Sequence, residues 1–312
     1  MTIERDVWVR EVGTRDGLQS IPTQFSTDAK LEWIRREAAA GVPEIEVGSF
    51  VPPKLLPQMA DTADVVSGAL EVDGLRVTVL VPNLRGAQNG FASGAHQLSF
   101  PLSVSEAHSQ ANLRKSVDDA LDDFEAIMEY RKSNSEYENV RIGAGLATAF
   151  GCTIAGAVDI KAVLRAAERI VSLGVDEIGV ADTVGYGNPR QCREIFTEVL
   201  NIAGDIPVAA HFHDTRGLGL ANVDAALEVG VRHFDASLGG LGGCPYAPGA
   251  SGNIVTDDLV FMLEAMGLRT GIDLDLLVDA RRYMEQHLDG EPTHGAFATA
   301  GKPKGFVAAT AA

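Results

Sequence analysis

Short apolar runs alternate along the chain with longer stretches in which apolar residues recur with helical spacing. Short runs rich in β-branched residues predict strands, and the longer amphipathic stretches predict helices. Regular alternation of the two is typical of a parallel sheet built from strand–helix–strand units. Eight strands are predicted, at residues 7–12, 44–50, 76–81, 96–100, 140–150, 177–183, 207–213 and 233–238.

Several predicted helices begin at Ser, Asp or Asn and end at Gly, as helix capping favours. Eight units without a Gly-, Ser- or Pro-rich linker inside residues 1–265 indicate a (β/α)8 barrel, because doubly wound sheets usually have fewer strands. Residues 1–290 are therefore expected to form one barrel domain, closed by two C-terminal helices. Residues 291–312 form a short segment rich in Gly and Ala, and we expect a flexible tail that could fold over a partner subunit. The helix candidates include 27–41, 116–133, 159–174, 188–204, 220–230, 256–267 and 273–288.

Composition narrows the possible partners. The 312 residues are 46% hydrophobic and 22% charged, a balance typical of a globular protein. A net charge of −17 argues against nucleic acid or an anionic membrane as main partner, because both require a basic surface. The three cysteines are odd in number and widely spaced, which indicates a reducing compartment. No signal sequence or membrane-length apolar run is found, so we expect a cytoplasmic protein.

In the predicted barrel, a polar residue at the carboxyl end of a strand is a candidate active-site residue, because active sites of such barrels lie at these strand ends. Each polar residue there could serve structure alone, as an ion pair or a helix cap, but together they form one set at one rim. The set comprises Arg15 and Asp16 after the first strand, Glu46 in the second, Asp182 and Thr183 at the sixth, His211 and His213 in the seventh, and Cys244 and Asn253 in the loop after the eighth.

The spacing of His211 and His213 places both imidazoles on one face of a strand. Alone, the pair is consistent either with a metal site or with two hydrogen-bonded core side chains. Together with the Asp16 carboxylate and the Asn253 carboxamide, it suits a divalent ion such as Mg2+, Mn2+ or Zn2+. Because oxygen is well represented and no thiolate belongs to the set, we expect Mg2+ or Mn2+. Asp214 alternates to the other side and is expected to support the site or the fold.

Cys244 lies in a loop with too many glycines for a protein core, a composition that suits a lid over a substrate. Cys152 and Cys192 are expected to be structural, since one closes a strand and the other lies in an amphipathic helix.

Four segments carry a resemblance to a known family. They read VGTRDGLQ, IEVGSFVPPKLLPQMAD, HFHDTRGLGLANVDAALEVGV, and GGLGGCPYAPGASGN followed by TDDLVFMLEAMG. Together they resemble the hydroxymethylglutaryl-CoA lyase family of metal-dependent barrel lyases, from about Arg5 to Val278. The last segment is highly specific, whereas a histidine pair alone would be a weak signal.

The resemblance implies a role for each matching residue. Arg15 would face the thioester carbonyl and stabilise an enolate, and Cys244 would close over the substrate and take part in proton transfer. Ser49 and Thr183 lie at the same rim and are candidate substrate-binding residues with Arg15. The segment after the fourth strand, with His108, Asn112, Arg114 and Lys115, could hold the acyl or pantetheine chain. The implied metal ligands are Asp16, His211, His213 and Asn253, and the implied acidic residues of the site are Glu46 and Asp182.

The implied reaction is retro-aldol cleavage of a 3-hydroxyacyl-CoA, such as 3-hydroxy-3-methylglutaryl-CoA, to acetyl-CoA and acetoacetate. A bound metal lowers the pKa of the substrate hydroxyl, and a fixed arginine stabilises the developing enolate oxygen. The base that accepts the hydroxyl proton stays open among a metal-bound water, Asp182 and an imidazole.

Two segments depart from the family pattern, SIPTQF after RDGLQ and GCTIAG after the fifth strand. Because loops at the mouth shape the substrate, the reaction type is better supported than the substrate. Citramalyl-CoA and longer branched 3-hydroxyglutaryl thioesters stay as alternatives. So do a Claisen-type synthase or oxo-acid aldolase and a non-catalytic CoA sensor, although a pure binder needs no arginine facing an enolate. We also expect a homo-oligomer.

Overall fold

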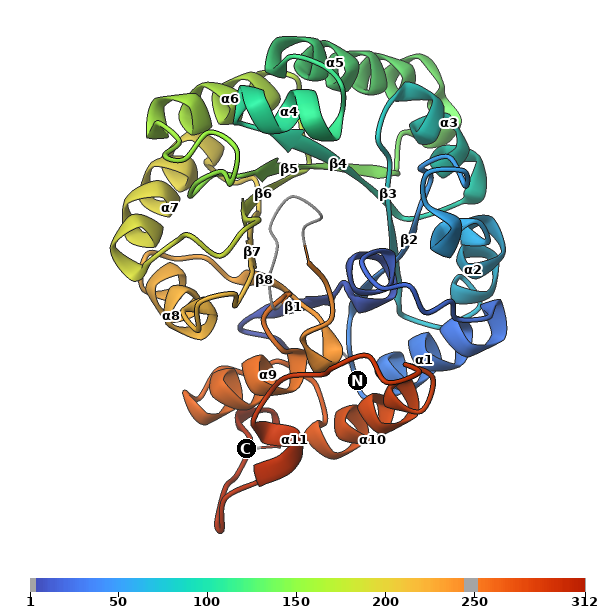
Figure 1. Ribbon diagram of the computed structural model, residues 1–312, viewed down its shortest axis with the longest axis vertical. Helices are drawn as coiled ribbons and strands as arrows, with labels where there is room; N and C mark the ends of the chain where they lie inside the picture. The colour runs from blue at the N-terminus through green and yellow to red at the C-terminus, as the bar shows by residue number, and fades with distance from the viewer. Residues whose placement is uncertain (1–3, 244–251, 312) are drawn as a thin grey trace.

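Eight parallel strands form a closed barrel, in which each strand pairs with the next and β8 pairs with β1. The computed structural model describes residues 4–243 and 252–311, and helices surround the barrel as an outer ring (Figure 1). The (β/α)8 barrel predicted from the alternation of elements is therefore confirmed. The strands are β1 Trp8–Glu11, β2 Glu44–Ser49, β3 Arg76–Leu80, β4 Gln97–Ser103, β5 Arg141–Ala147, β6 Glu177–Asp182, β7 Val208–Phe212 and β8 His233–Ala236.

Local capping chemistry sets where the helices begin. Ser116 and Asp119 form a capping box, in which each side chain accepts a hydrogen bond from the backbone N–H of the other. Asn188 caps α7, and Pro189 at its first turn suits the fixed backbone geometry there. The helices are α1 Thr27–Ala39, α2 Thr62–Ala69, α3 Leu84–Ser93, α4 Glu106–Asn112, α5 Val117–Ser133, α6 Ile160–Ser172, α7 Pro189–Ala203, α8 Gly219–Glu228, α9 Thr256–Ala265, α10 Leu274–Glu285 and α11 Phe297–Ala300.

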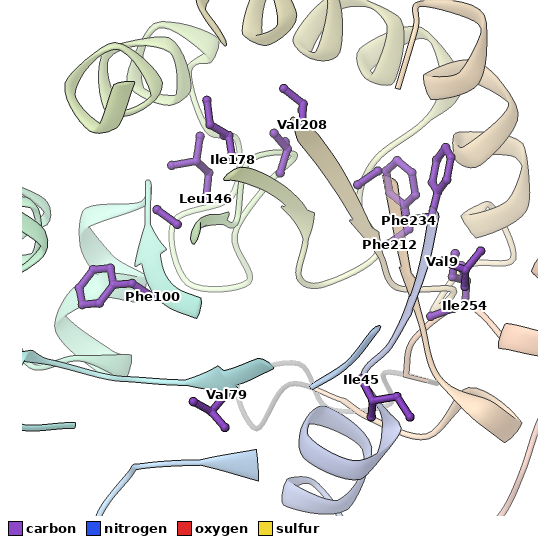
Figure 2. Packing of buried hydrophobic residues seen from close by; sticks show 14 of the residues in the cluster. Val9, Ile45, Val79, Phe100, Leu146, Ile178, Val208, Phe212, Phe234 and Ile254 are labelled. Carbon is purple, nitrogen blue, oxygen red and sulfur yellow. The ribbon is translucent and has the colours of Figure 1, made fainter. Parts of the chain in front are cut away.

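The apolar residues of the strands pack against the surrounding helices. Figure 2 shows Val79, Phe100 and Ile178 pointing away from the barrel interior, and all three are fully buried. Because successive strand residues point to opposite sides, the alternate positions face the interior. On β7 the outward residues are apolar, while His211 faces inward and lines a cavity. The wall of the barrel therefore separates an apolar core outside from a polar space inside.

The C-terminal residues contact α9. The Phe261 ring lies 5.0 Å from that of Phe297 and 5.2 Å from that of Phe306, between ring centroids. The Asp258 carboxylate accepts hydrogen bonds from the backbone N–H groups of Ala296 and Phe297. These contacts place the segment beside the closing helices, and its flexibility and the boundary at residue 290 stay predictions.

Within residues 4–243 and 252–311, no helix is both long and apolar enough to cross a membrane.

Candidate active site

The first strand leads into a short helical turn, Gly13–Gly17, that carries Arg15 and Asp16 at the mouth of the barrel. A side chain at Gly13 would not fit, because its Cβ would lie 2.6 Å from Glu11 Oε1. The Arg15 guanidinium donates hydrogen bonds to Asp16 Oδ1, at 2.6 Å, and to the buried Glu46 carboxylate. Arg15 is thus held rigidly between two carboxylates, with only 9% of its surface exposed.

The two histidines of the seventh strand converge on Asp16. The Nε2 atoms of His211 and His213 lie 3.2 Å apart, and Asp16 Oδ2 lies 4.0 and 3.8 Å from them. One ligand atom from each of the three residues falls within 4.8 Å of the others. Such a compact set of one carboxylate and two imidazoles can hold a divalent metal ion.

Asn253 completes this group from the other side of the loop after β8. It forms an isolated antiparallel bridge with His213, and its Nδ2 donates to Asp16 Oδ2 at 2.7 Å and to the Leu241 carbonyl at 3.0 Å. Within the part of the chain that the structure describes, Asn253 Oδ1 and His213 Nδ1 are buried without a hydrogen-bond partner. The unpaired Asn253 Oδ1 fits a metal site, because a bound cation would satisfy a buried oxygen lone pair that no donor reaches.

The protonation states also favour metal binding. Burial opposes ionisation of Asp16, but Arg15 and the two imidazoles lower its pKa to about 2. Burial, and then the neighbouring His211, lowers the pKa of His213 to about 4. Burial is also the largest single influence on His211 and lowers its pKa, but the hydrogen bond to Asp235 and the negative charges of Asp235 and Asp16 together outweigh burial and raise the pKa. Asp16 is therefore an anion and His213 a neutral imidazole at pH 7, which are the forms that bind metals.

A residue that the sequence pattern did not predict orients the first histidine. Asp235 of β8 lies with its Oδ2 3.1 Å from His211 Nδ1, an arrangement that directs Nε2 of the same ring toward Asp16. Arg10, beside Asp235 in register, approaches it at 3.5 Å and pairs with Glu44 at 2.9 Å and with Glu177. This buried charge network fills the barrel interior next to the candidate metal ligands.

A cavity of about 630 Å3 at the carboxyl ends of the strands is lined by Asp16, His211, His213 and Asp235, whereas Asn253 and Glu46 do not line it. His108 is 3% exposed, its Nδ1 lies 2.7 Å from Ser103 Oγ, and burial lowers its pKa. The Thr183 hydroxyl accepts a hydrogen bond from the Thr148 N–H. Residues from the sequence prediction that line the cavity are Arg15, Asp16, His108, Asn112, Arg114, Lys115, Thr183, His211 and His213.

Two other candidate residues face the surrounding backbone. Both Asp182 oxygens accept hydrogen bonds at 2.8 Å, from the N–H groups of Tyr186 and Gly187, and burial raises its pKa. Ser49 accepts a hydrogen bond from the Val51 N–H and lines a separate cavity of about 250 Å3. In this structure Asp182 therefore holds the loop after β6, and Ser49 holds the loop after β2. Their catalytic and substrate-binding roles stay predictions.

Cys244, which the resemblance implies takes part in proton transfer, lies outside the described residues. Its neighbour Gly243 lines the cavity, so the chain enters the undescribed segment at the site itself. Cys152 and Cys192 are buried, in keeping with structural roles.

The HMGL-like family model matches residues 7–284. The chain is 38% identical to hydroxymethylglutaryl-CoA lyase YngG of Bacillus subtilis, over 94% of this chain and 96% of that protein. It is 39% identical to the cytoplasmic 3-hydroxy-3-methylglutaryl-CoA lyase of Rattus norvegicus, over 88% of this chain and 79% of that protein.

A solved structure of an HMG-CoA lyase from Acinetobacter baumannii, in complex with coenzyme A and 3-methylmalate, is also similar. Its TM-score is 0.90 at 40% identity, and the match covers 98% of this chain and 99% of that chain. The likeness therefore extends over the whole barrel and its closing helices.

Proposed function

The chain belongs to the HMGL-like family, as its sequence motifs predict, and we propose that it is a divalent-metal-dependent carbon–carbon lyase acting on 3-hydroxy-3-methylglutaryl-CoA. The C2–C3 bond breaks, the hydroxyl proton leaves, and a proton is added to C2, which gives acetyl-CoA and acetoacetate. The observation that carries the proposal is the convergence of Asp16, His211 and His213 beside Arg15 in one cavity. Relatives named as lyases for this substrate support the same reading.

Asp16, His211, His213 and Asn253 are the proposed ligands of the metal. When bound, the metal would lower the pKa of the substrate hydroxyl and orient the bond that breaks. We propose Mg2+ or Mn2+, because the donors are oxygen and nitrogen atoms without a thiolate. Asp235 contributes by fixing the His211 ring through its Nδ1.

Arg15 is the proposed stabiliser of the enolate oxygen. Its guanidinium carries a permanent positive charge and is held in place by Glu46 and Asp16 before the substrate arrives. A charge fixed in advance needs no reorganisation when the enolate forms, which makes such groups effective in catalysis. Glu46 is therefore proposed to position Arg15.

Cys244 is the proposed proton donor to C2 of the enolate. Its place in the chain supports this role, because it follows Gly243 of the cavity wall and precedes Asn253 by nine residues. The acceptor of the hydroxyl proton stays open among a metal-bound water, an imidazole and Asp182. Both His211 and His213 line the cavity, whereas the Asp182 carboxylate is occupied by backbone N–H groups.

The test is a panel of 3-hydroxyacyl-CoA thioesters, each incubated with the purified protein and with Mg2+ or Mn2+, while product acyl-CoA is followed. We expect 3-hydroxy-3-methylglutaryl-CoA to yield acetyl-CoA and acetoacetate in equal amounts. Incubation of acetyl-CoA with oxo-acids, with release of free CoA as the readout, identifies a synthase instead. Absence of cleavage of every thioester would overturn the proposal.

A cytoplasmic location and a homo-oligomeric state stay predictions. Size-exclusion chromatography with light scattering measures the second directly.

A further inference from the structure

The inner surface of β4, β5 and β6 is made of small residues. We call Ser99, Pro101, Gly145, Ala147, Gly179 and Ala181 the small-residue wall, since all six are half-buried and line the cavity. Their neighbours on the outer face of the same strands include Phe100, Leu146 and Ile178, which are fully buried among the helices (Figure 2). Barrel interiors are ordinarily filled by bulky branched side chains, so this wall leaves space that most barrels do not have.

Of the two glycines of this wall, Gly145 is not required by the backbone. Neither Gly145 nor Gly179 has the positive φ angle that favours glycine. A Cβ at Gly145 would meet only the Phe100 carbonyl oxygen, at 4.0 Å, so the position is open. A Cβ at Gly179, by contrast, would lie only 3.2 Å from Gly145 Cα, so glycine there allows the close approach of the two strands. The missing side chain at Gly145 therefore creates volume.

The open space lies directly beside the candidate metal ligands. Gly145 pairs with Gly179 across β5 and β6, and Ala181, two residues further along β6, pairs with His211. Since residues two apart point to the same side, the small-residue wall continues without interruption to the ring of His211. A substrate with its hydroxyl at the metal therefore places a further C3 substituent against this wall.

The charges of the cavity floor decide which substituent can enter. Arg10 there faces three carboxylates, from Glu44, Glu177 and Asp235, and Arg76 also pairs with Glu44. Carboxylates outnumber guanidinium groups in this network, so the floor repels another carboxylate. The CoA part of the substrate is too long to be enclosed and must leave through the mouth of the barrel. Of the remaining parts of the substrate, the uncharged alkyl group on C3 suits the space beside the small-residue wall.

We propose that the small-residue wall forms an acyl chamber that admits 3-hydroxy-3-alkylglutaryl-CoA thioesters whose C3 alkyl group is larger than methyl, with Gly145 as the residue that determines the size. This inference rests on the proposed lyase function. A methyl group alone would leave the chamber largely empty, whereas a chain of several carbons would cover the wall with apolar contact.

The experiment compares two substrates, 3-hydroxy-3-methylglutaryl-CoA and 3-hydroxy-3-butylglutaryl-CoA, in the native protein and in two variants. In the native protein we expect the two values of kcat/KM to agree within about tenfold. In Gly145→Leu we expect the butyl-to-methyl ratio of kcat/KM to fall at least about 100-fold, since single methylene mismatches in such pockets already change the ratio roughly 10- to 200-fold. Gly145→Ala adds only one carbon atom to open space. Its butyl-to-methyl ratio of kcat/KM is expected to lie between those of the native protein and Gly145→Leu.

The outcomes separate the inference from the function on which it depends. If the native protein cleaves neither substrate, the proposed function fails. If it cleaves only the methyl substrate, or if both variants leave the butyl-to-methyl ratio at the native value, the acyl chamber is wrong while the lyase function stands. Gly145→Ala keeps the test decisive if Gly145→Leu does not fold.

Discussion

The two sides of the barrel interior differ in what they contribute to the cavity. The side formed by β7, β8 and β1 carries His211, Asp235 and Arg10, close to the Arg15 and Asp16 turn. The side formed by β4, β5 and β6 carries the small-residue wall. The first side is an array of charged groups held by mutual contacts, whereas the second, apart from Glu177 in the charged network of the floor, provides uncharged space. The comparison indicates that chemistry and substrate size are controlled by different strands, and therefore by residues that can be changed separately.

The largest effect is expected at Arg15, at the centre of the charged side. Arg15→Gln removes the fixed positive charge beside Asp16. It should lower kcat for the cleavage of 3-hydroxy-3-methylglutaryl-CoA by about 1,000-fold. The measurement is acetyl-CoA release, with circular dichroism to verify folding. Arg36→Gln, which removes an exposed partner of Glu32 on α1, is the matched control. Turnover of Arg15→Gln close to native would show that the charged side does not carry the chemistry as proposed.

The next effect concerns the metal. His213→Ala deletes one of the four proposed ligands, and metal affinity should fall by more than about 100-fold because the three that are left hold the ion less tightly. Metal content after dialysis measures this directly and does not depend on activity. His294→Ala, at an exposed histidine, is the control. Unchanged metal content in His213→Ala would mean that the histidine pair is structural.

A smaller effect is expected one contact away from the ligands. Asp235→Asn leaves the shape of the side chain but removes the carboxylate that faces His211 Nδ1, so metal affinity should fall about 10- to 100-fold. The exposed Asp279→Asn is the control. Titration with Mn2+ gives the affinity of both variants. An unaltered metal affinity in Asp235→Asn would mean that Asp235 does not support metal binding through His211 and serves only the ion-pair network of Arg10.

The sequence could predict the charged side better than the small-residue wall. Arg15, Asp16 and the histidines stand at strand ends, and in a barrel all such ends meet at one rim. Asp235 stands at a strand end too, but its contact with His211 depends on the pairing of β7 with β8, which the order of residues within one strand does not reveal.

The small-residue wall was hidden for a different reason. The glycines of the fifth strand weaken its strand pattern, and only the closed sheet shows that Gly145 and Gly179 face the same space. Asp182 shows the opposite case. Its position at the end of a strand predicted a catalytic role, but in the structure its oxygens accept hydrogen bonds from the loop that follows. A rim position alone does not specify which way a side chain turns.

The smallest effect concerns stability, and it distinguishes the sides once more. Glu11 of β1 and Glu37 of α1 are both fully buried. They lie between the outer face of the barrel and the helix, behind the charged side of the interior. Burial, and then the neighbouring Glu11 carboxylate, raises the pKa of Glu37 above its ordinary 4.5. The folded protein therefore holds a proton that the unfolded chain releases, and this group lowers stability as the pH rises above 4.5.

Glu37→Gln removes this titration, so its Tm relative to native should increase between pH 5 and pH 8, by about 2 °C. Glu32→Gln, at a half-buried position of the same helix, should show no such trend. Thermal unfolding followed by circular dichroism at both pH values tests the sign. A Tm difference that is constant or shrinks with pH would show that folding does not raise the pKa of Glu37. A growing difference would mean that the charged side reduces stability through its buried acids, a penalty that the uncharged small-residue wall does not carry.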